Sequence, residues 1–590
     1  MRIGRFCAVV IGLFLAAGPS PAATAPVRPA ATNVPGSSEV VVTGVIDRKK
    51  GSWKRAESDH VIVIGQDSAA ELTRVSRNLE RLYYLMARLY RHGDTSDDTV
   101  KMQVVLFDSP ASLRAMNLRN LRSEQGPFLP AFADPTYYDP RENGEVLAIG
   151  RSEQIVDLNT MRAFNLDCDD ASEERGPFEG LPSCAEIVPT RKPAIMNWEQ
   201  MLYARFAQHF ILTYDPGVYP RWYLDGIGAL FSTIAVKGDG SMDYAGPLIP
   251  YRLVFRAYGD MNVGDILTGR YLESAPGKAE WTPYHAWLLA HYFLFSNPKP
   301  ERAAQFRRYM TELHRGVSMA EAAKVFGDMA ALQREVLSHG ERDIVYAHAK
   351  PQAEMGDVLI STLPPASAAL IQARIALGTR LGLDGKGAAG ATDPASPGGQ
   401  WLAQVRGVIA EQHYDAEAFL FAAEAECRSG HADACLADAE TVLTKTPNDA
   451  RALAWKGAAL TDRALAGPAD ARAQELALAR QTIAHAIALD ETAIEPRILY
   501  FESFTKASER VPEAAMQGMA IAIRRVPAAP APRLYLAEEL VRQGQADLAQ
   551  RLLYTVIHGG YDSPEKRTAE ALFAQGGEGA MAPSHRAILR

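Results

Sequence analysis

The chain has too little cysteine to be a scaffold built on disulfides. Only 5 of its 590 residues are cysteine, whereas small secreted domains that depend on disulfides are far richer in it. It also lacks a basic surplus, because 62 lysines and arginines face 70 aspartates and glutamates and the formal net charge is −8. Proteins that bind a phosphate backbone usually carry such a surplus. Composition therefore argues against a nucleic-acid partner.

Long apolar runs are also absent, except at the start of the chain. Arg2 and Arg5 precede the apolar run Phe6–Gly18, and a short stretch of small residues and proline follows it. This order is typical of a secretory signal peptide. We predict a signal peptide over residues 1–22, an exported protein that is periplasmic or secreted, and no integral membrane span after cleavage. An uncleaved anchor is the alternative, although the run is shorter than the roughly 20 residues that a transmembrane helix needs.

Changes in composition and periodicity divide the rest of the chain. Residues 23–52 are rich in Ala, Pro, Val, Gly and Ser without a sustained period, which predicts a linker. Residues 53–350 carry short β-branched runs and then mostly helical periodicity, which predicts an α+β domain. We expect a helical connector and a Gly/Pro-rich linker over 351–399. Helical repeats then cover 400–575, and a tail covers 576–590.

The first domain shows both strand and helix patterns. Runs rich in β-branched and apolar residues predict strands over 60–65, 101–107 and 145–150. Apolar residues at helical spacing predict helices at residues 68–91, 194–213, 221–236, 283–296, 300–314, 318–326 and 328–338.

The C-terminal region repeats itself. The sequence Asp415–Ala418 recurs in similar form as Asp449–Ala452, 34 positions later. Paired helices with a period near 34 resemble tetratricopeptide (TPR) repeats, here with an insertion near 464–474. Because stacked repeats present a concave binding surface, the resemblance implies a protein or peptide partner bound through these repeats. A generic helical bundle is the alternative.

Four cysteines lie beyond the predicted signal peptide, in two closely spaced pairs. Cys168 and Cys184 flank an acidic loop, and Cys427 and Cys435 fall at a turn within one repeat. In an exported protein such pairs predict two local disulfides. Neither spacing is that of a zinc ribbon or a redox motif. Four free, buried thiols are the alternative.

The densest functional pattern lies where two predicted helices meet. The first contains Trp198–Phe210, a turn with Pro216 and Pro220 follows, and the second opens with Trp222–Gly226. This arrangement resembles the core of the gluzincin metallopeptidases, the peptidase MA-like domain, over residues 53–350. In exported bacterial proteins that domain is often followed by TPR repeats.

The gluzincin resemblance implies four functional positions. In that family the first helix carries H-E-x-x-H, in which two histidines hold zinc and the glutamate is the general base, and the second helix adds a third ligand. Ala204 has no donor atom, and Arg205 places a permanent cation where the base should stand. Gln208 offers only a neutral amide, which is a poor zinc ligand. Of the four, only Asp225 can ligate a metal.

The resemblance therefore implies a degenerate H-E-x-x-H motif with no metal, no catalytic residues and no cofactor. We predict a non-catalytic protein- or peptide-binding protein, in which a pseudopeptidase domain is coupled to a TPR scaffold. A zinc metallopeptidase with atypical ligands is one alternative, and a structural component of the cell envelope is another.

Two of these positions carry opposite charges, which suggests how a site without zinc could stay folded. Arg205 and Asp225 occupy positions that face a shared metal in gluzincins, so we hypothesise a salt bridge between them. In the alternative, Arg205 extends to solvent and Asp225 is an ordinary first-turn acid. His209 lies one residue past the ligand position, about 100° around the helix, and is expected to point away from the site.

Overall fold

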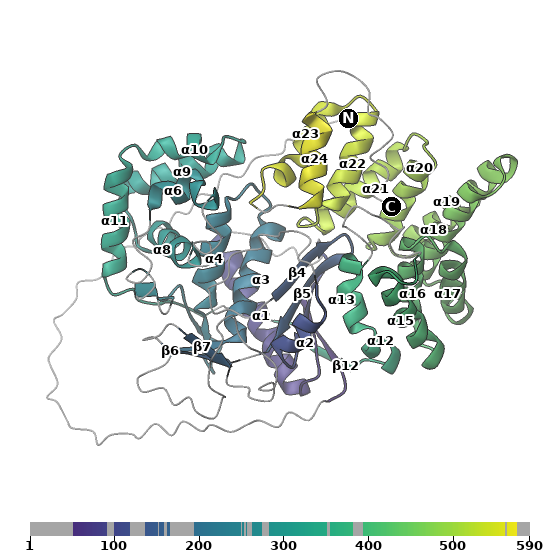
Figure 1. The fold of residues 1–590 in the computed structure, drawn as a ribbon, viewed down its shortest axis with the longest axis horizontal. Coiled ribbons are helices and arrows are strands. Elements are labelled where there is room, and N and C mark those ends of the chain that lie inside the picture. The colour runs from purple at the N-terminus through teal and green to yellow at the C-terminus, as the bar shows by residue number, and fades with distance from the viewer. Residues whose placement is uncertain are drawn as a thin grey trace. The chain divides into compact units, whose positions relative to one another are not determined.

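A six-stranded mixed sheet organises the first part of the chain in the computed structural model (Figure 1). The strand order is β12-β1-β2-β3-β5-β4, with parallel pairing between β2 and β3 and between β3 and β5 and antiparallel pairing elsewhere. The strands are β1 (Lys54–Glu57), β2 (Val61–Gly65), β3 (Met102–Phe107), β4 (Thr136–Arg141), β5 (Gly144–Gly150) and β12 (Leu359–Thr362).

The structure describes most of the chain beyond residue 50. The described residues are 51–90, 99–118, 136–151, 153–157, 162–165, 194–248, 251–252, 255, 262–273, 282–350, 355–380, 393–560 and 563–574. The predicted signal peptide and nearly all of the predicted linker lie outside them, as do Cys168 and Cys184. None of the described helices combines the length and the apolar character that a bilayer crossing requires.

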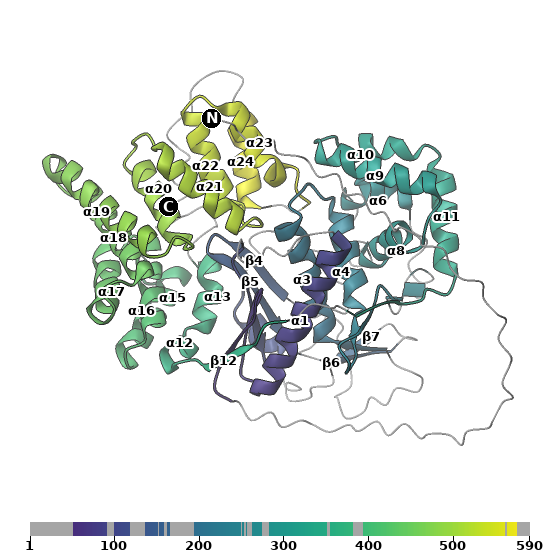
Figure 2. The same ribbon diagram turned by 180° about the vertical axis from the view of Figure 1, so that it is seen from behind.

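The central strands are buried on both faces, and alternate residues serve two cores. Val104 and Leu106 of β3 pack in one core with the helices α1 (Ala69–Tyr90) and α3 (Trp198–Tyr214), which lie side by side in Figure 2. Val105 and Phe107 point to the other face and into a second core. This alternation follows from the two-residue period of a strand.

The second core joins the sheet to the start of the repeat region. It contains Phe107 of β3 and Ala148 of β5 together with Leu370, Trp401 and Phe421, which come from the connector and the first repeat helices. The elements on this face are α2 (Pro110–Ala115), α12 (Pro365–Ala369), α13 (Ile371–Arg380), α15 (Pro397–Glu411) and α16 (Ala416–Arg428). The connector predicted over 351–399 thus also supplies β12, an edge strand of the main sheet.

Helices and two small sheets complete the first part. The three-stranded sheets have the orders β11-β10-β9 and β7-β6-β8. Their strands are β6 (Glu153–Asp157), β7 (Arg162–Asn165), β8 (Ala194–Asn197), β9 (Ala235–Val236), β10 (Met242–Tyr244) and β11 (Ala347–Ala349). The helices are α4 (Arg221–Ser232), α6 (Val263–Thr268), η3 (Arg270–Glu273), α8 (Thr282–Phe295), α9 (Pro300–His314), α10 (Met319–Ala322), η4 (Ala323–Phe326) and α11 (Met329–Glu341).

Two predicted helix boundaries are wrong. The helix expected over 194–213 begins only at Trp198, because the four residues before it form β8 and Asn197 caps the helix. The helix expected over 221–236 ends at Ser232, and a short strand follows it. In both cases a strand borders the helix, and apolar periodicity does not mark the change.

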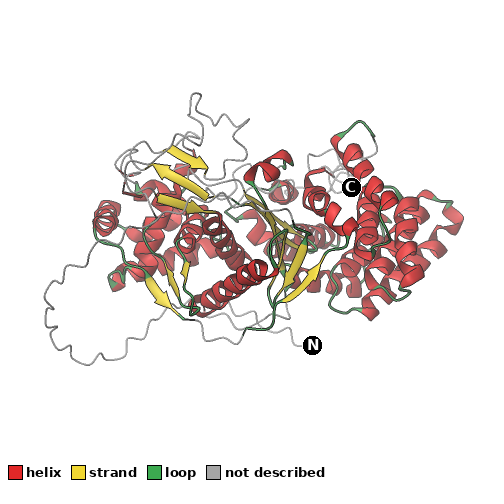
Figure 3. Ribbon diagram, turned by 90° about the horizontal axis from the view of Figure 1, so that it is seen from below, coloured by secondary structure: helices red, strands yellow, loops and turns green. Residues whose placement is uncertain are grey.

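After β12 the described residues contain helices and no further strand (Figure 3). Successive helices pack as neighbours, and α18 also contacts the first helices before and after it, α16 and α20. The expected insertion near 464–474 lengthens α18 and α19, which stand out in Figure 1. The remaining helices are α17 (Ala432–Lys445), α18 (Ala450–Ala466), α19 (Ala469–Leu489), α20 (Glu495–Lys506), α21 (Glu513–Arg525), α22 (Ala531–Arg542), α23 (Ala546–Ile557) and α24 (Pro564–Ala574).

The shared core predicts that the sheet and the first repeat helices unfold together. Leu370 is fully buried between them, so Leu370→Ala should lower the free energy of unfolding by about 3 kcal/mol. Val345→Ala, at a side chain that is 76% exposed, is the control and should change it by less than about 0.5 kcal/mol. Denaturant titration followed by circular dichroism measures both. Two separate transitions, of which only one shifts, would contradict a shared core.

Candidate functional site

The helix α3 runs through the interior of the first part. Its N-terminus is capped by Asn197, whose Oδ1 accepts a hydrogen bond from the backbone N–H of Glu199 at 2.9 Å. Nearly every residue from Trp198 to Tyr214 is buried. A helix that is apolar on most sides needs neighbours on all of them, and here the sheet, α1 and α4 provide them. The polar side chains of α3 must therefore find partners inside the protein.

The helix α4 packs tightly between α3 and α8. Gly226 makes this possible, because a Cβ atom at that position would lie 2.6 Å from the carbonyl oxygen of Ala286 on α8. The helix α4 also packs against α3. The four gluzincin-like positions, Ala204, Arg205, Gln208 and Asp225, all lie on these two helices and are all buried.

A chain of hydrogen bonds links the sheet, α3 and α4 at these positions. Arg205 donates from Nε to Oγ1 of Thr136 on β4 at 2.8 Å and from Nη1 to Oε1 of Gln208 at 3.2 Å. Gln208 in turn donates from Nε2 to the backbone carbonyl of Leu224 on α4 at 3.1 Å. We call this chain the Arg205–Gln208 relay. It crosses between the helices at Arg205 and Gln208, two of the positions that the sequence resemblance singled out.

Gly228 is a residue whose role in this site the sequence did not indicate. A Cβ atom there would lie 2.7 Å from Nε2 of Gln208 and 3.1 Å from its Cδ. Glycine therefore leaves the space that the Gln208 amide occupies against α4. Thr136 was also missed, because the strand β4 that holds it was not predicted.

Asp225 has an arginine partner within its own helix. Nε of Arg221, four residues earlier, lies 3.5 Å from Oδ2 of Asp225, and both side chains are almost completely buried. An arginine at this i,i+4 spacing compensates the charge of the carboxylate. Arg205 meanwhile donates to Thr136 and Gln208. These contacts do not test the hypothesised bridge between Arg205 and Asp225, which stays a prediction.

These residues do not fit a zinc ion. Ala204 has no donor atom, and both ends of the Gln208 amide are engaged in the relay. Asp225 lies beside the guanidinium of Arg221. Within the described part of the chain, no group of three or more His, Cys, Asp or Glu residues is arranged to hold a metal ion. A zinc site needs about three protein ligands, so this arrangement supports no metal-activated water.

His209 belongs to a separate buried cluster. Its Nδ1 lies 3.3 Å from the hydroxyl of Tyr138 and 3.3 Å from that of Thr213. Burial lowers the pKa of His209 to about 3, so the ring is neutral at physiological pH. His209 is thus a hydrogen-bonded core residue between α3 and β4.

Glu145 is a buried acid that no sequence motif indicated. It lies on β5 with only 1% of its surface exposed, and burial raises its pKa to about 7. The nearby hydroxyl of Thr213 on α3 partly opposes this shift. The one available signal was a charged residue at the start of the apolar strand sequence that ends at Gly150.

The first helices of the repeat pairs carry a ladder of ion pairs. Arg451 on α18 contacts Glu417 on α16 at 2.9 Å and Glu495 on α20 at 3.4 Å. Lys506 on α20 contacts Asp462 on α18 at 3.0 Å. Glu417 and Arg451 are 34 positions apart, so the sequence period brings opposite charges together on neighbouring helices. We call the surface formed by α16, α18, α20 and α22 the first-helix surface.

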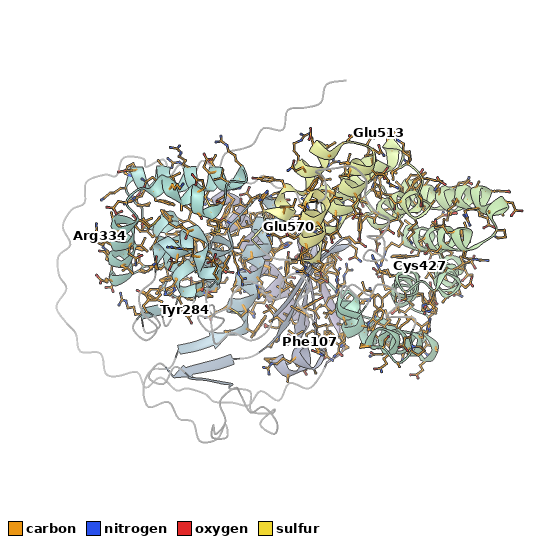
Figure 4. The ribbon with its side chains drawn as sticks, turned by 45° about the horizontal axis from the view of Figure 1, so that its top comes forward. Phe107, Tyr284, Arg334, Cys427, Glu513 and Glu570 are labelled. Carbon is orange, nitrogen blue, oxygen red and sulfur yellow. A yellow bond between two sulfur atoms is a disulfide. The ribbon has the colours of Figure 1, made fainter. Side chains whose placement is uncertain are left out.

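A disulfide joins Cys427 to Cys435 and closes the turn between α16 and α17 (Figure 4 labels Cys427). Both cysteines lie in the core of this repeat, beside Trp455 of α18. The predicted Cys168–Cys184 pair falls outside the described residues and stays a prediction.

Comparison with known proteins identifies no family. No family model matches the chain, and no curated protein matches it. Among solved structures, it is similar to TTC0263, a thermophilic TPR protein of Thermus thermophilus, with 16% identity over 30% of this chain and 87% of that one and a TM-score of 0.26.

Two further solved structures are similar over parts of the chain. A MamA RS-1 ArsTM double mutant shows 16% identity over 32% of this chain and 93% of its own, with a TM-score of 0.20. Yeast Tom70 shows 15% identity over 53% of this chain and 63% of its own, with a TM-score of 0.23. Such low scores carry no argument, so the repeat architecture rests on the helix pairs of this chain itself.

The raised pKa of Glu145 predicts that the difference in stability between the wild type and Glu145→Gln depends on pH. Because its pKa is raised in the folded state, from 4.5 to about 7, its neutral form is favoured by folding. The resulting stability is present at low pH and is lost as the pH rises toward 7. Relative to Glu145→Gln, the wild-type free energy of unfolding should fall by about 2 kcal/mol between pH 5 and pH 8. Urea titrations of both proteins at the two pH values measure this, and a difference that does not change with pH would contradict a neutral buried carboxyl.

Proposed function

We propose that the chain is a non-catalytic protein- or peptide-binding protein, in which a degenerate gluzincin-like domain is coupled to a TPR-like scaffold. The Arg205–Gln208 relay carries this proposal. The positions that would hold zinc and its base are filled by a relay of neutral and cationic donors. Without a general base and a set of metal ligands, α3 and α4 can form a folded surface but cannot activate a water molecule.

The binding role is supported by the repeat helices. Solenoids of helix pairs present extended surfaces to protein segments, and here the first-helix surface is rich in charge. Some of its ion-pair members are partly buried, as the 34% exposure of Arg451 and the 14% exposure of Glu495 show, whereas Glu417 and Lys506 are exposed. Partly buried charges of both signs favour a partner with a defined pattern of charges, because mismatched charges at such a surface are costly.

We also propose that the protein acts outside the cytoplasm, after export through its N-terminal signal peptide. The support is the sequence of residues 1–22, with two arginines before a short apolar run. The disulfide between Cys427 and Cys435 is consistent with an oxidising compartment.

Partner capture from the native envelope tests the binding role. Deleting residues 400–575 is a poor test, because the first repeat helices cover one face of the sheet. Arg451→Gln is more selective, since it removes the cation that links three first helices. We expect wild-type protein to recover a defined partner and Arg451→Gln to recover about tenfold less of it. Quantitative mass spectrometry of crosslinked eluates makes the measurement.

Arg510→Gln is the matched control, because Arg510 is an exposed arginine of the repeat region that is not among the residues of this ladder. It should recover the partner as well as the wild type does, and circular dichroism should show that all three proteins are folded at the temperature of the capture. Recovery that is unaffected by Arg451→Gln would contradict binding at the first-helix surface. Recovery of no defined partner would favour a structural envelope component instead.

A further inference from the structure

The turn between β4 and β5 reaches beyond the sheet to the repeat helices. The register pairs Arg141 with Gly144, so Glu142 and Asn143 form a two-residue turn. Gly144 has φ +118°, and a Cβ atom there would lie 2.8 Å from Cγ1 of Val100. Glycine is therefore required at residue 144, both because of the positive φ angle and because a side chain there would clash with Val100. We call residues 141–144 the hairpin tip.

Glu142 binds an arginine that is already held in place. Nη2 of Arg428 on α16 donates to Oε1 of Glu142 at 2.5 Å, and the Glu142 side chain is only 12% exposed. The same guanidinium donates from Nε to Glu424 at 2.9 Å and lies over the ring of Trp455, 5.7 Å from its centroid. Arg428 thus presents its Nη2 edge to one carboxylate in a fixed orientation.

Arg141 attaches the hairpin tip to a second element, the connector helix α13. Its guanidinium donates from Nη1 to the carbonyl of Arg374 at 2.6 Å and from Nη2 to that of Ile375 at 2.5 Å. These carbonyls belong to α13, while Asp139 accepts from Nε of Arg141 at 2.7 Å. The tip therefore bridges the connector helix and the first repeat pair.

The remaining tip contacts reach later repeat pairs. Burial raises the pKa of Glu495 on α20, and a hydrogen bond from Asn143 opposes that shift. Burial also raises the pKa of Glu502 on α20 and of Tyr535 on α22, and the negative charge of Glu142 adds to both shifts. The hairpin tip is therefore bonded to α16 through Glu142 and to α20 through Asn143.

We propose that the hairpin tip is a resident occupant of the first-helix surface, and that Arg428 is a carboxylate-binding position that a protein partner engages by displacing Glu142. A partner that fits would present an acidic side chain on a tight turn, as the tip does. Glu424 accepts a hydrogen bond from the same guanidinium, and Glu495 and Glu502 interact with it electrostatically, so anions that do not reach the guanidinium are disfavoured. This inference rests on the proposed binding function and adds the chemistry of the partner and its competition with the chain itself.

The physical consequence is intramolecular competition. A tethered segment acts at an effective concentration in the millimolar range, so a free segment of similar affinity competes poorly. Loosening the tip should raise the apparent affinity for a partner without creating any new contact.

A peptide copy of the hairpin tests the proposal directly. The probe is a fluorescein-labelled peptide with the sequence of residues 136–150, closed by an added terminal disulfide so that the turn is kept. The proteins are the full wild-type chain and the double variant Arg141→Ala/Glu142→Gln, which releases the tip. Fluorescence anisotropy should show that the double variant binds the peptide at least about tenfold more tightly than the wild type does.

Two further variants locate the site. Adding Arg428→Gln to the double variant should return the affinity to the wild-type level, and a peptide with Glu142→Gln should lose about tenfold in affinity. Asp343→Asn removes an exposed ion pair with Arg252 elsewhere and should bind as the wild type does. Circular dichroism and thermal unfolding show that each variant is folded.

Three outcomes would overturn the inference. They are equal affinity of the wild type and the double variant, no effect of Arg428→Gln, and no binding by a folded double variant. If any of these occurs while Arg451→Gln still reduces partner capture, the proposed function stands and only the occupancy of the surface is wrong. If the peptide binds as expected and no partner is captured, the hairpin tip occupies the surface as inferred and the proposed function is wrong.

Discussion

A permanent cation inside a helical core is the constraint around which the first part of the chain is arranged. The Arg205 side chain is buried on α3, and an unpaired buried charge costs several kcal/mol. Its guanidinium must therefore find hydrogen-bond acceptors inside the core. Thr136 on β4 and Gln208, one turn along the helix, provide them. Gln208 can reach α4 only because residue 228 is glycine. One buried cation thus constrains several neighbouring residues on three elements.

The same reasoning extends to the repeat region, where charge again lies in partly buried positions. Arg428 and Arg451 each join neighbouring elements through carboxylates. Because the shared core around Leu370 already fixes the first repeat helices on the sheet, a hairpin from that sheet can contribute Glu142 to a repeat arginine. Sheet and solenoid are thus linked by an apolar core on one side and by ion pairs at the hairpin tip.

Local patterns made part of this architecture predictable. The strands β2, β3 and β5 and the helix α1 follow from apolar periodicity, and the 34-residue recurrence at Asp415 and Asp449 predicts the paired helices. The short separation of Cys427 and Cys435 predicts their pairing. Each of these signals lies within a few residues, or within one repeat, of the feature that it predicts.

Features that depend on contacts between distant segments were not predictable. The strand β12 joins the sheet from a segment about 300 residues after β1, its neighbour, and no local pattern reports such pairing. Thr136 as the acceptor for Arg205 was missed for the same reason, because 69 positions separate the two. Arg221 was missed as a partner of Asp225 although it lies one helical turn away. Which groups meet depends on side-chain directions in the packed helices, which the sequence does not encode locally.

The central claim is that apolar packing and the hydrogen bond from Gln208 to Leu224, and not a metal, hold α3 against α4. It is tested most directly by the zinc content of the intact protein, purified without chelators, loaded with excess zinc and dialysed against metal-free buffer before elemental analysis. The account predicts far less than one zinc ion per chain, with no change on Asp225→Asn. Stoichiometric zinc that Asp225→Asn removes, and that the exposed control Asp343→Asn leaves in place, would contradict it.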